Sequence, residues 1–126
     1  MNTKDKPSYR VVIAGGRTFQ DYDLLSARCK DILADKMGTF EVTILSGGAK
    51  GADQLGERFA KEHNLDIEYH KADWKAFGKR AGLIRNAEMA ENADALIAFW
   101  DGTSTGTKNM IDNAYQNGLI VDIIHY

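Results

Sequence analysis

Five short apolar runs divide the 126-residue chain, and helical patterns of apolar residues lie between them. The runs do not alternate apolar with polar residues, which is typical of strands buried on both faces, as in parallel sheets. They lie at residues 10–14, 42–46, 67–70, 95–99 and 119–124. The helical patterns lie at residues 22–36, 51–63, 82–91 and 106–117. Strands that alternate with helices predict right-handed βαβ units, and therefore an α/β three-layer sandwich around a five-stranded, mainly parallel sheet flanked by helices.

Each helical pattern places its apolar side chains on one stripe, which we expect to face the sheet. The residues of the four stripes are Leu25, Cys29, Ile32 and Leu33; Ala52, Leu55, Phe59 and Ala60; Leu83, Ala87 and Ala90; and Met110, Ile111 and Ala114. Cys29 is the only cysteine, so it cannot form an internal disulfide, and we interpret it as a small buried apolar residue. We expect residues 10–126 to form a single domain and residues 1–9 to form an N-terminal tail.

The charge balance limits the classes of partner. The chain carries 16 Lys and Arg against 18 Asp and Glu, so no overall positive field favours a nucleic-acid partner. The polar start MNTKDKPSYR lacks the apolar core of a secretory signal. No apolar run approaches the roughly 18 to 20 residues that cross a membrane. We therefore expect a cytoplasmic protein without a membrane partner.

Three glycine-rich loops follow the first, second and fourth predicted strands. The carboxyl ends of parallel strands share one edge of the sheet, and ligands bind there where the strand order reverses, so we expect one common site. Glycines let a phosphate or ribose approach backbone N–H groups, and helix N-termini and hydroxyls add further donors. The predicted binding residues are Gly15, Gly16, Arg17 and Thr18; Ser46, Gly47, Gly48, Ala49, Gly51 and Asp53; and Asp101, Gly102, Thr103, Thr105, Gly106 and Thr107. In particular, we expect Gly16, Gly47 and Gly106 to line one cleft.

Two common phosphate-binding motifs are absent from these loops. No GxGxxG pattern follows the first strand, so the dinucleotide fingerprint is missing. In the last loop only three residues separate Gly102 from Gly106, and Thr107-Lys108 reverses the Lys-Thr order of a P-loop. The three histidines are scattered without the spacing of metal ligands, so we expect neither a metal site nor a cofactor.

A basic segment, KADWKAFGKRAGLIRN, joins the third strand to the third helix at residues 71–86. Its lysines are interpreted as a solvated surface. Arg85 differs, because it falls in the first turn of the predicted helix, where its forked guanidinium can clamp a phosphate or carboxylate. We add Trp74, Arg85 and the adjacent Asn86 to the predicted binding residues.

Four segments together resemble the YspA-type, YpsA-related branch of the SLOG superfamily. The segments are VVIAGGRTF, ILSGGAKGADQLGERFAKEHNL, KADWKAFGKRAGLIRNAEM and ALIAFWDGTSTGT. That superfamily also contains the LOG phosphoribohydrolases and the DNA-processing protein DprA. The resemblance implies a Rossmann-like domain whose glycine loops hold a nucleotide-like small molecule. It also implies a homo-oligomer and a possible role in phage–host conflict, but no particular reaction.

The match to the LOG enzymes is incomplete. Their Arg-Lys-x-x-Met helix start is similar to residues 85–89, with Asn86 in place of Lys. Their Pro-Gly-Gly-x-Gly-Thr-x-x-Glu motif is similar to residues 102–110, where Gly106 and Thr107 match. Met110 stands where the catalytic Glu should be. The resemblance thus predicts ligand binding without cleavage of the LOG type.

Three functions remain open at this point. The first is binding of a nucleotide or nucleotide-derived ligand, for sensing or sequestration. The second is an N-glycosidic or phosphoribosyl hydrolase that uses another carboxylate, for which Asp53 and Asp101 are the catalytic candidates. The third is single-stranded DNA binding as in DprA, which only the basic segment with Trp74 and Phe77 favours.

Overall fold

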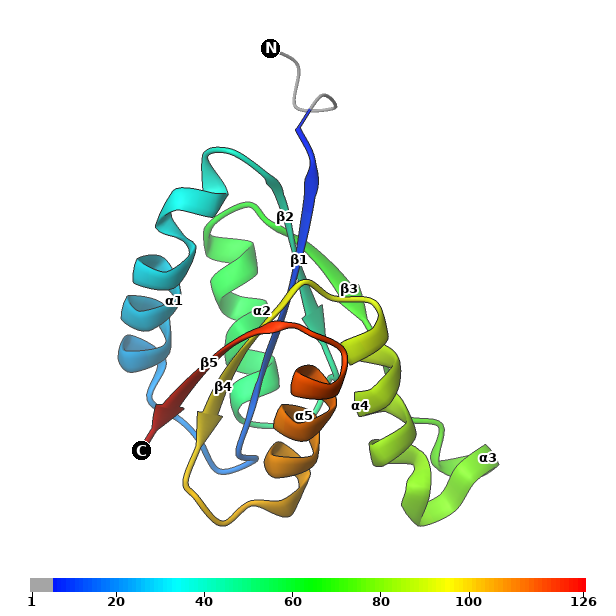
Figure 1. Cartoon of the computed structure of the whole chain (residues 1–126). Coiled ribbons are helices and arrows are strands. Elements are labelled where there is room, and N and C mark those ends of the chain that lie inside the picture. The colour runs from blue at the N-terminus through cyan, green and yellow to red at the C-terminus, as the bar shows by residue number, and fades with distance from the viewer. Residues whose placement is uncertain (1–5) are drawn as a thin grey trace.

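Strands and helices alternate along the chain in the computed structural model, which describes residues 6–126 (Figure 1). The elements are β1 (Ser8–Gly15), α1 (Tyr22–Met37), β2 (Glu41–Ser46), α2 (Ala52–Glu62), β3 (Asp66–Tyr69), α3 (Trp74–Phe77), the 3₁₀ helix η2 (Gly78–Arg80), α4 (Ala81–Glu91), β4 (Ala95–Trp100), α5 (Thr105–Gln116) and β5 (Ile120–His125). None of the helices in residues 6–126 is long and apolar enough to cross a membrane.

The five strands form one parallel sheet with the order β3-β2-β1-β4-β5. This confirms the predicted α/β, Rossmann-like fold, and the sheet is parallel throughout. The chain runs outward from β1 to β3 and then returns to the other side of β1 with β4 and β5. The strand order therefore reverses between β1 and β4, which is where open parallel sheets bind ligands.

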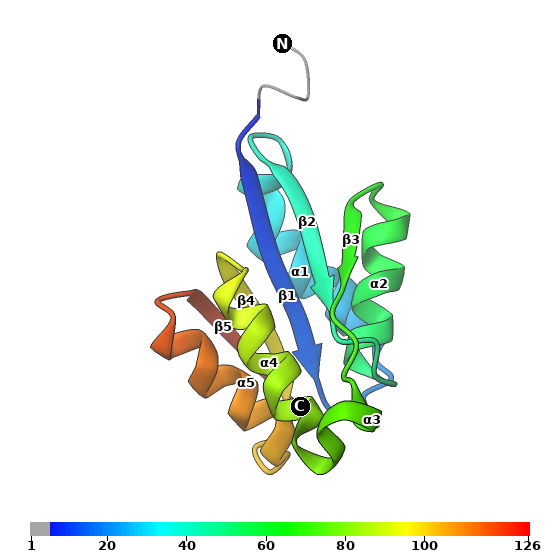
Figure 2. The ribbon, with the colours of Figure 1, turned by 90° about the vertical axis from the view of Figure 1, so that its right-hand side faces the viewer.

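Helices cover both faces of the sheet, as Figure 2 shows from the side. Because side chains alternate along a strand, Val11 and Ile13 of β1 pack toward α1 and α2, whereas Val12 and Ala14 pack toward α4 and α5. Burial of each large apolar side chain stabilises the fold by roughly 1.5 to 3 kcal/mol. These two apolar layers hold the carboxyl ends of the strands in fixed positions.

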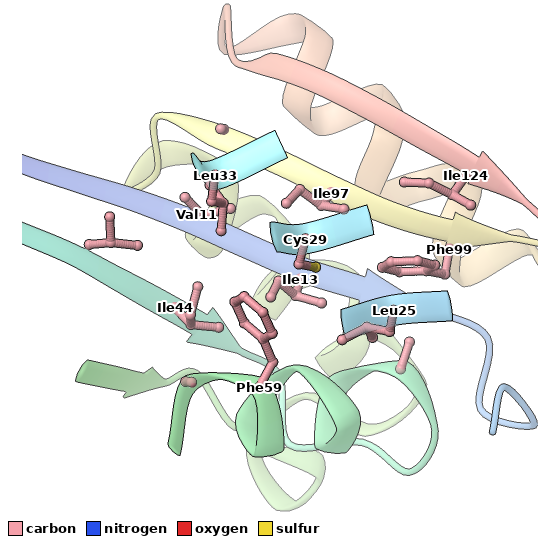
Figure 3. Close-up of a cluster of buried hydrophobic side chains, with 14 of the residues drawn as sticks. Val11, Ile13, Leu25, Cys29, Leu33, Ile44, Phe59, Ile97, Phe99 and Ile124 are labelled. Atoms are coloured by element: carbon pink, nitrogen blue, oxygen red, sulfur yellow. The ribbon is translucent and has the colours of Figure 1, made fainter. Parts of the chain in front are cut away.

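Cys29 lies inside the layer formed by α1 and α2, between Leu25 and Leu33 of the same helix and close to Ile13 (Figure 3). Its side chain is fully buried, and this burial raises the pKa of the thiol to about 12. The thiolate that would make it reactive is therefore suppressed. The interpretation of Cys29 as a buried apolar residue is confirmed.

Two local expectations need correction. Leu83 does not face the sheet, because its side chain is 49% exposed while Met89 and Ala90 are buried. Leu83 precedes Ala90 by seven residues, which is only about 20° around the helix axis, so both lie on nearly the same side of α4. Its exposure follows from its place in the first turn of α4, two turns before the buried Met89 and Ala90, where the neighbouring elements leave it uncovered. The first strand also begins at Ser8 rather than residue 10, because Ser8 and Tyr9 pair with β2. The remaining tail residues 1–5 lie outside the described residues.

Candidate functional site

A cleft of about 480 Å³ lies at the carboxyl ends of β1 and β4, where the strand order reverses. We call it the switch-point cleft. Its walls come from the loops after β1, β2 and β4 and from the beginnings of α2 and α5, with α4 on one side. The lining residues are Ala14, Gly15, Gly16, Arg17, Thr18, Ala49, Asp53, Arg85, Asn86, Met89, Asp101, Ser104, Thr105, Gly106, Thr107 and Met110.

A second cavity of about 740 Å³ adjoins this cleft on the side of the basic segment. We call it the cationic cavity; its lining residues are Arg17, Gly47, Gly48, Ala49, Lys50, Lys71, Ala72, Trp74 and Arg85. It shares Arg17, Ala49 and Arg85 with the switch-point cleft. Gly16 and Gly106 thus line one cleft, whereas Gly47 lines the cavity beside it.

Four predicted binding residues line neither space and instead shape the loops: Ser46, Gly51, Gly102 and Thr103. The Ser46 hydroxyl donates to Glu57 Oε2 over 2.6 Å and accepts from the Gly48 N–H over 3.1 Å. These bonds hold the turn after β2. A positive φ of 87° at Gly102 turns the chain after β4. These residues support the site without facing it.

Some lining residues were not predicted from the sequence. Met89 and Ala14 reach the cleft from the buried face of the fold, and Lys50 and Lys71 reach the cationic cavity. Ser104 could have been predicted from the sequence, because a serine three residues before Thr107 at a predicted helix start is a typical N-cap. The other positions follow only from tertiary contacts.

The beginning of α5 is built as an ordered turn. Ser104 is the N-cap, and its Oγ accepts from the Thr107 N–H over 3.4 Å. Asp101 Oδ1 accepts from the N–H groups of Thr103 and Ser104 over 2.9 and 2.8 Å. These backbone hydrogen bonds lower the pKa of Asp101, so its carboxylate is ionised. Asp101 therefore acts as a turn former that sets the direction of α5, although it also borders the cleft.

Gly106 is the second residue of α5, and nothing in the surrounding fold requires a glycine there. A Cβ added to it would meet no atom of the described chain within 4 Å, and its φ is not positive. Glycine inside a helix costs about 0.5 to 1 kcal/mol relative to alanine. The missing side chain leaves open space at the mouth of the switch-point cleft.

Arg85 and Asn86 connect the glycine loops that follow β2 and β4. Arg85 Nη1 donates to the carbonyl of Gly47 over 2.8 Å, and Arg85 Nε donates to Asn86 Oδ1 over 3.0 Å. Asn86 Nδ2 in turn donates to the carbonyl of Gly106 over 3.3 Å and to Asn109 Oδ1 over 3.0 Å. A guanidinium has five N–H donors, so Arg85 retains donors for a ligand between the two spaces.

Gly47 lies between two charged side chains. A Cβ at this position would come within 2.5 Å of Arg85 Nη1 and 2.8 Å of Asp53 Oδ2. Any larger residue would therefore push the guanidinium or the carboxylate out of place. The glycine allows opposite charges to approach the same turn from α2 and α4.

Asp53 is a buried carboxyl group at the start of α2, with only 6% of the residue exposed. Its Oδ2 accepts from the Ala49 N–H over 3.2 Å. Burial raises the pKa of Asp53 from 3.8 to about 6, and the Ala49 hydrogen bond and the charge of Arg85 only partly oppose this rise. A carboxyl group that titrates near neutral pH can act as a general acid or base.

Replacement of Asp53 by asparagine should raise the free energy of unfolding by about 2 kcal/mol near neutral pH. The unfolded chain releases the Asp53 proton near 3.8, whereas the folded protein keeps it up to about 6. Stability of the wild type therefore falls as the pH rises through this window, and asparagine has no such proton to lose. Urea unfolding at about pH 3.5 and pH 7.5 measures the difference. An equal gain at both pH values would contradict ionisation as its cause.

Metal ligands do not gather at this site. Within residues 6–126, no group of three His, Cys, Asp or Glu side chains could hold a metal ion. The cationic cavity is lined by four cations and no carboxylate, which suits an anion. The switch-point cleft combines Arg17, Arg85, hydroxyls and an amide with the carboxyl groups of Asp53 and Asp101.

The sequence matches one protein family and one curated phage protein. A family model described as the YspA, cpYpsA-related SLOG family matches residues 9–77. The matched part runs from β1 to α3 and includes the loops after β1 and β2. The Gene 61 protein of Mycobacterium phage D29 is 36% identical over 120 residues, covering 89% of this chain and 93% of the phage protein.

Two solved structures share the fold. DNA processing protein A (DprA) from Streptococcus pneumoniae matches 98% of this chain with a TM-score of 0.69 at 17% identity. The chain spans only about half of DprA, 52% of its length. The structure of TM1055 matches 92% of this chain and 72% of its own length, with a TM-score of 0.60 at 21% identity. At such low identities the likeness concerns the fold alone.

Proposed function

The chain belongs to the YspA, cpYpsA-related SLOG family, and from this membership and its switch-point cleft we propose that it binds a nucleotide or a nucleotide-derived phosphorylated ligand. Binding serves sensing or sequestration. One observation carries the proposal: the open start of α5 at Gly106 and the guanidinium of Arg85 border the same cleft, where the strand order reverses. A helix N-terminus supplies unpaired N–H donors, and an arginine supplies a forked cation, so together they suit a phosphate.

A hydrolase that cleaves an N-glycosidic or phosphoribosyl bond is the second candidate. Cleavage requires a carboxylate that activates water or stabilises a cationic ribosyl centre. Met110 lines the cleft and can do neither. Asp53 is the better of the two carboxylate candidates, because it is buried beside Arg85 while Asp101 is engaged with its own turn.

Isothermal titration calorimetry with a panel of nucleoside mono-, di- and triphosphates and ADP-ribose tests the binding proposal. Saturable binding without release of free base supports it. Base release by the wild type that Asp53→Asn abolishes, with binding retained, would promote the hydrolase instead. Mass spectrometry of small molecules that co-purify with the native protein identifies the base.

Replacement of Gly106 by alanine should raise the stability of the fold and weaken nucleotide binding. We expect the free energy of unfolding to rise by about 0.5 kcal/mol, because alanine favours the helix and meets no neighbouring atom. Affinity for a nucleotide should fall several-fold, because the added methyl group occupies the space at the start of α5. Urea unfolding and calorimetry measure the two effects.

Gly38→Ala is the matched control for this variant. Gly38 also has no atom of the described chain within 4 Å of an added Cβ and no positive φ, but it lies at the end of α1. It should leave nucleotide affinity unchanged. Unchanged affinity in Gly106→Ala as well would remove the start of α5 from the binding site.

A further inference from the structure

The cationic cavity has a charge pattern that differs from that of the switch-point cleft. Four cations line it, Arg17, Lys50, Lys71 and Arg85, and no Asp or Glu of the described residues does. Within residues 6–126, the ion pairs of the structure involve none of these four side chains. The carboxyl group of Asp53 compensates part of the charge of Arg85 from the side of the switch-point cleft. The four cations still give the cavity a net positive charge that attracts an anion.

An exposed indole borders the same cavity. Trp74 is 53% exposed, although most tryptophans in a folded domain are largely buried. It is the first residue of α3, and the side chain of Asp73 caps this helix by accepting from the Ala76 N–H over 3.0 Å. α3 stands at the end of the sheet where the strands finish (Figures 1 and 2). An aromatic face beside several cations suits a nucleobase attached to phosphates.

The two spaces are adjacent, because Arg17, Ala49 and Arg85 line both. A nucleoside monophosphate can place a phosphate beside these arginines, but it has no second group for the other space. A ligand with two linked phosphoryl groups can span the arginines and engage both spaces at once. Each volume, about 480 and 740 Å³, falls in the range of a small-ligand site.

From this arrangement we infer that the ligand is a nucleotide with a pyrophosphate linkage, whose base stacks on Trp74 in the cationic cavity and whose far end reaches the start of α5. The pyrophosphate lies across Arg17 and Arg85, and Lys71 neutralises the phosphoryl group nearer to the base. The inference rests on the proposed function. It adds the class of nucleotide and its orientation, with the base in the cationic cavity and the far end in the switch-point cleft.

Calorimetry with matched pairs of probes tests this inference on the full chain. The pairs are AMP with ADP and ADP-ribose, and GMP with GDP. For the base that binds, we expect the pyrophosphate member to bind at least about tenfold more tightly than the monophosphate. Lys71→Ala should reduce this ratio, whereas Lys75→Ala, on α3 outside both spaces, should not.

The affinity and fluorescence of Trp74 variants test separately whether the base stacks on Trp74. Trp74→Ala should weaken binding of the preferred probe by about tenfold, within the range for loss of one aromatic stacking partner. Phe77→Ala is the matched control, since Phe77 is 50% exposed on the same helix but lines neither space. Ligand-induced quenching of tryptophan fluorescence should be clearly smaller in Trp74→Phe, which retains an aromatic face and most of the affinity. The remaining response belongs to Trp100, whose indole donates to the Ser104 carbonyl at the switch-point cleft.

Three outcomes decide the matter. The expected ratio, together with the Trp74 effects, supports the inference. Equal affinity for monophosphate and pyrophosphate probes, or full affinity in Trp74→Ala, overturns the inference while the proposed function stands. Absence of binding by every nucleotide of the panel overturns both.

Discussion

Replacing Gly51 with alanine should lower the free energy of unfolding by about 3 to 5 kcal/mol. Gly51 has a φ of 83° and a ψ of −129°, a conformation that residues with a Cβ rarely adopt. A Cβ there would come within 2.3 Å of the Gly16 carbonyl oxygen and 2.6 Å of the Arg17 carbonyl carbon. Both are backbone atoms, which cannot rotate away as a side chain can.

The same change should also damage the binding site. The Ala52 N–H donates to the Gly16 carbonyl over 3.2 Å, so Gly51 lies where the loop after β1 meets the start of α2. Moving the loops apart displaces Gly16 and Arg17, which line the switch-point cleft. Urea unfolding followed by circular dichroism measures the stability, with Gly38→Ala as the control that should change it by less than about 1 kcal/mol. A similarly small loss in Gly51→Ala would contradict the steric argument.

Replacing Arg85 with alanine should weaken nucleotide binding by about 1.5 to 3 kcal/mol, roughly 10- to 150-fold. Arg85 is a half-buried cation that lines both spaces and retains donors beyond those given to Gly47 and Asn86. Burial lowers the pKa of its guanidinium, and a desolvated cation of this kind gains more from a bound phosphate than a solvated one. Arg85→Lys should recover only part of the affinity, because an ammonium cannot bridge Gly47 and a phosphate as a planar fork does.

Lys75→Ala is the control for charge. Lys75 is exposed on α3, so its removal changes the net charge equally but should cost little affinity. Circular dichroism shows whether the Arg85 variants remain folded, since the Gly47 carbonyl loses a hydrogen-bond partner in Arg85→Ala. Equal losses in the Arg85 and Lys75 variants, both removed by added salt, would indicate diffuse electrostatic attraction instead of a clamp.

Local patterns in the sequence were sufficient to predict the five strands and the four longer helices, but not the short α3 and η2 in the basic segment. The apolar runs around residues 10–14 and 95–99 are too short for buried helices, and the stripe with Leu25 and Cys29 has helical spacing. Leu83 shows the limit of this reasoning, because an apolar residue at a plausible helical spacing still proved to be exposed. Periodicity defines a helix, but the neighbours that pack against it define its buried face.

The sequence by itself determined the α/β fold, and it predicted the candidate site at the carboxyl edge of the sheet, bordered by the glycine loops. Strand order, and with it the reversal between β1 and β4, was decided only by the tertiary structure. The same holds for Arg85, which reaches a carbonyl 38 residues away in the chain, and for Asn86, which reaches one 20 residues away. Such hydrogen bonds, like the burial that raises the pKa of Asp53, depend on which distant segments meet. Local sequence patterns determine the tendency of a segment to form a helix or a strand. The ionisation, burial and hydrogen-bond partners of a side chain depend instead on the distant segments that folding brings next to it.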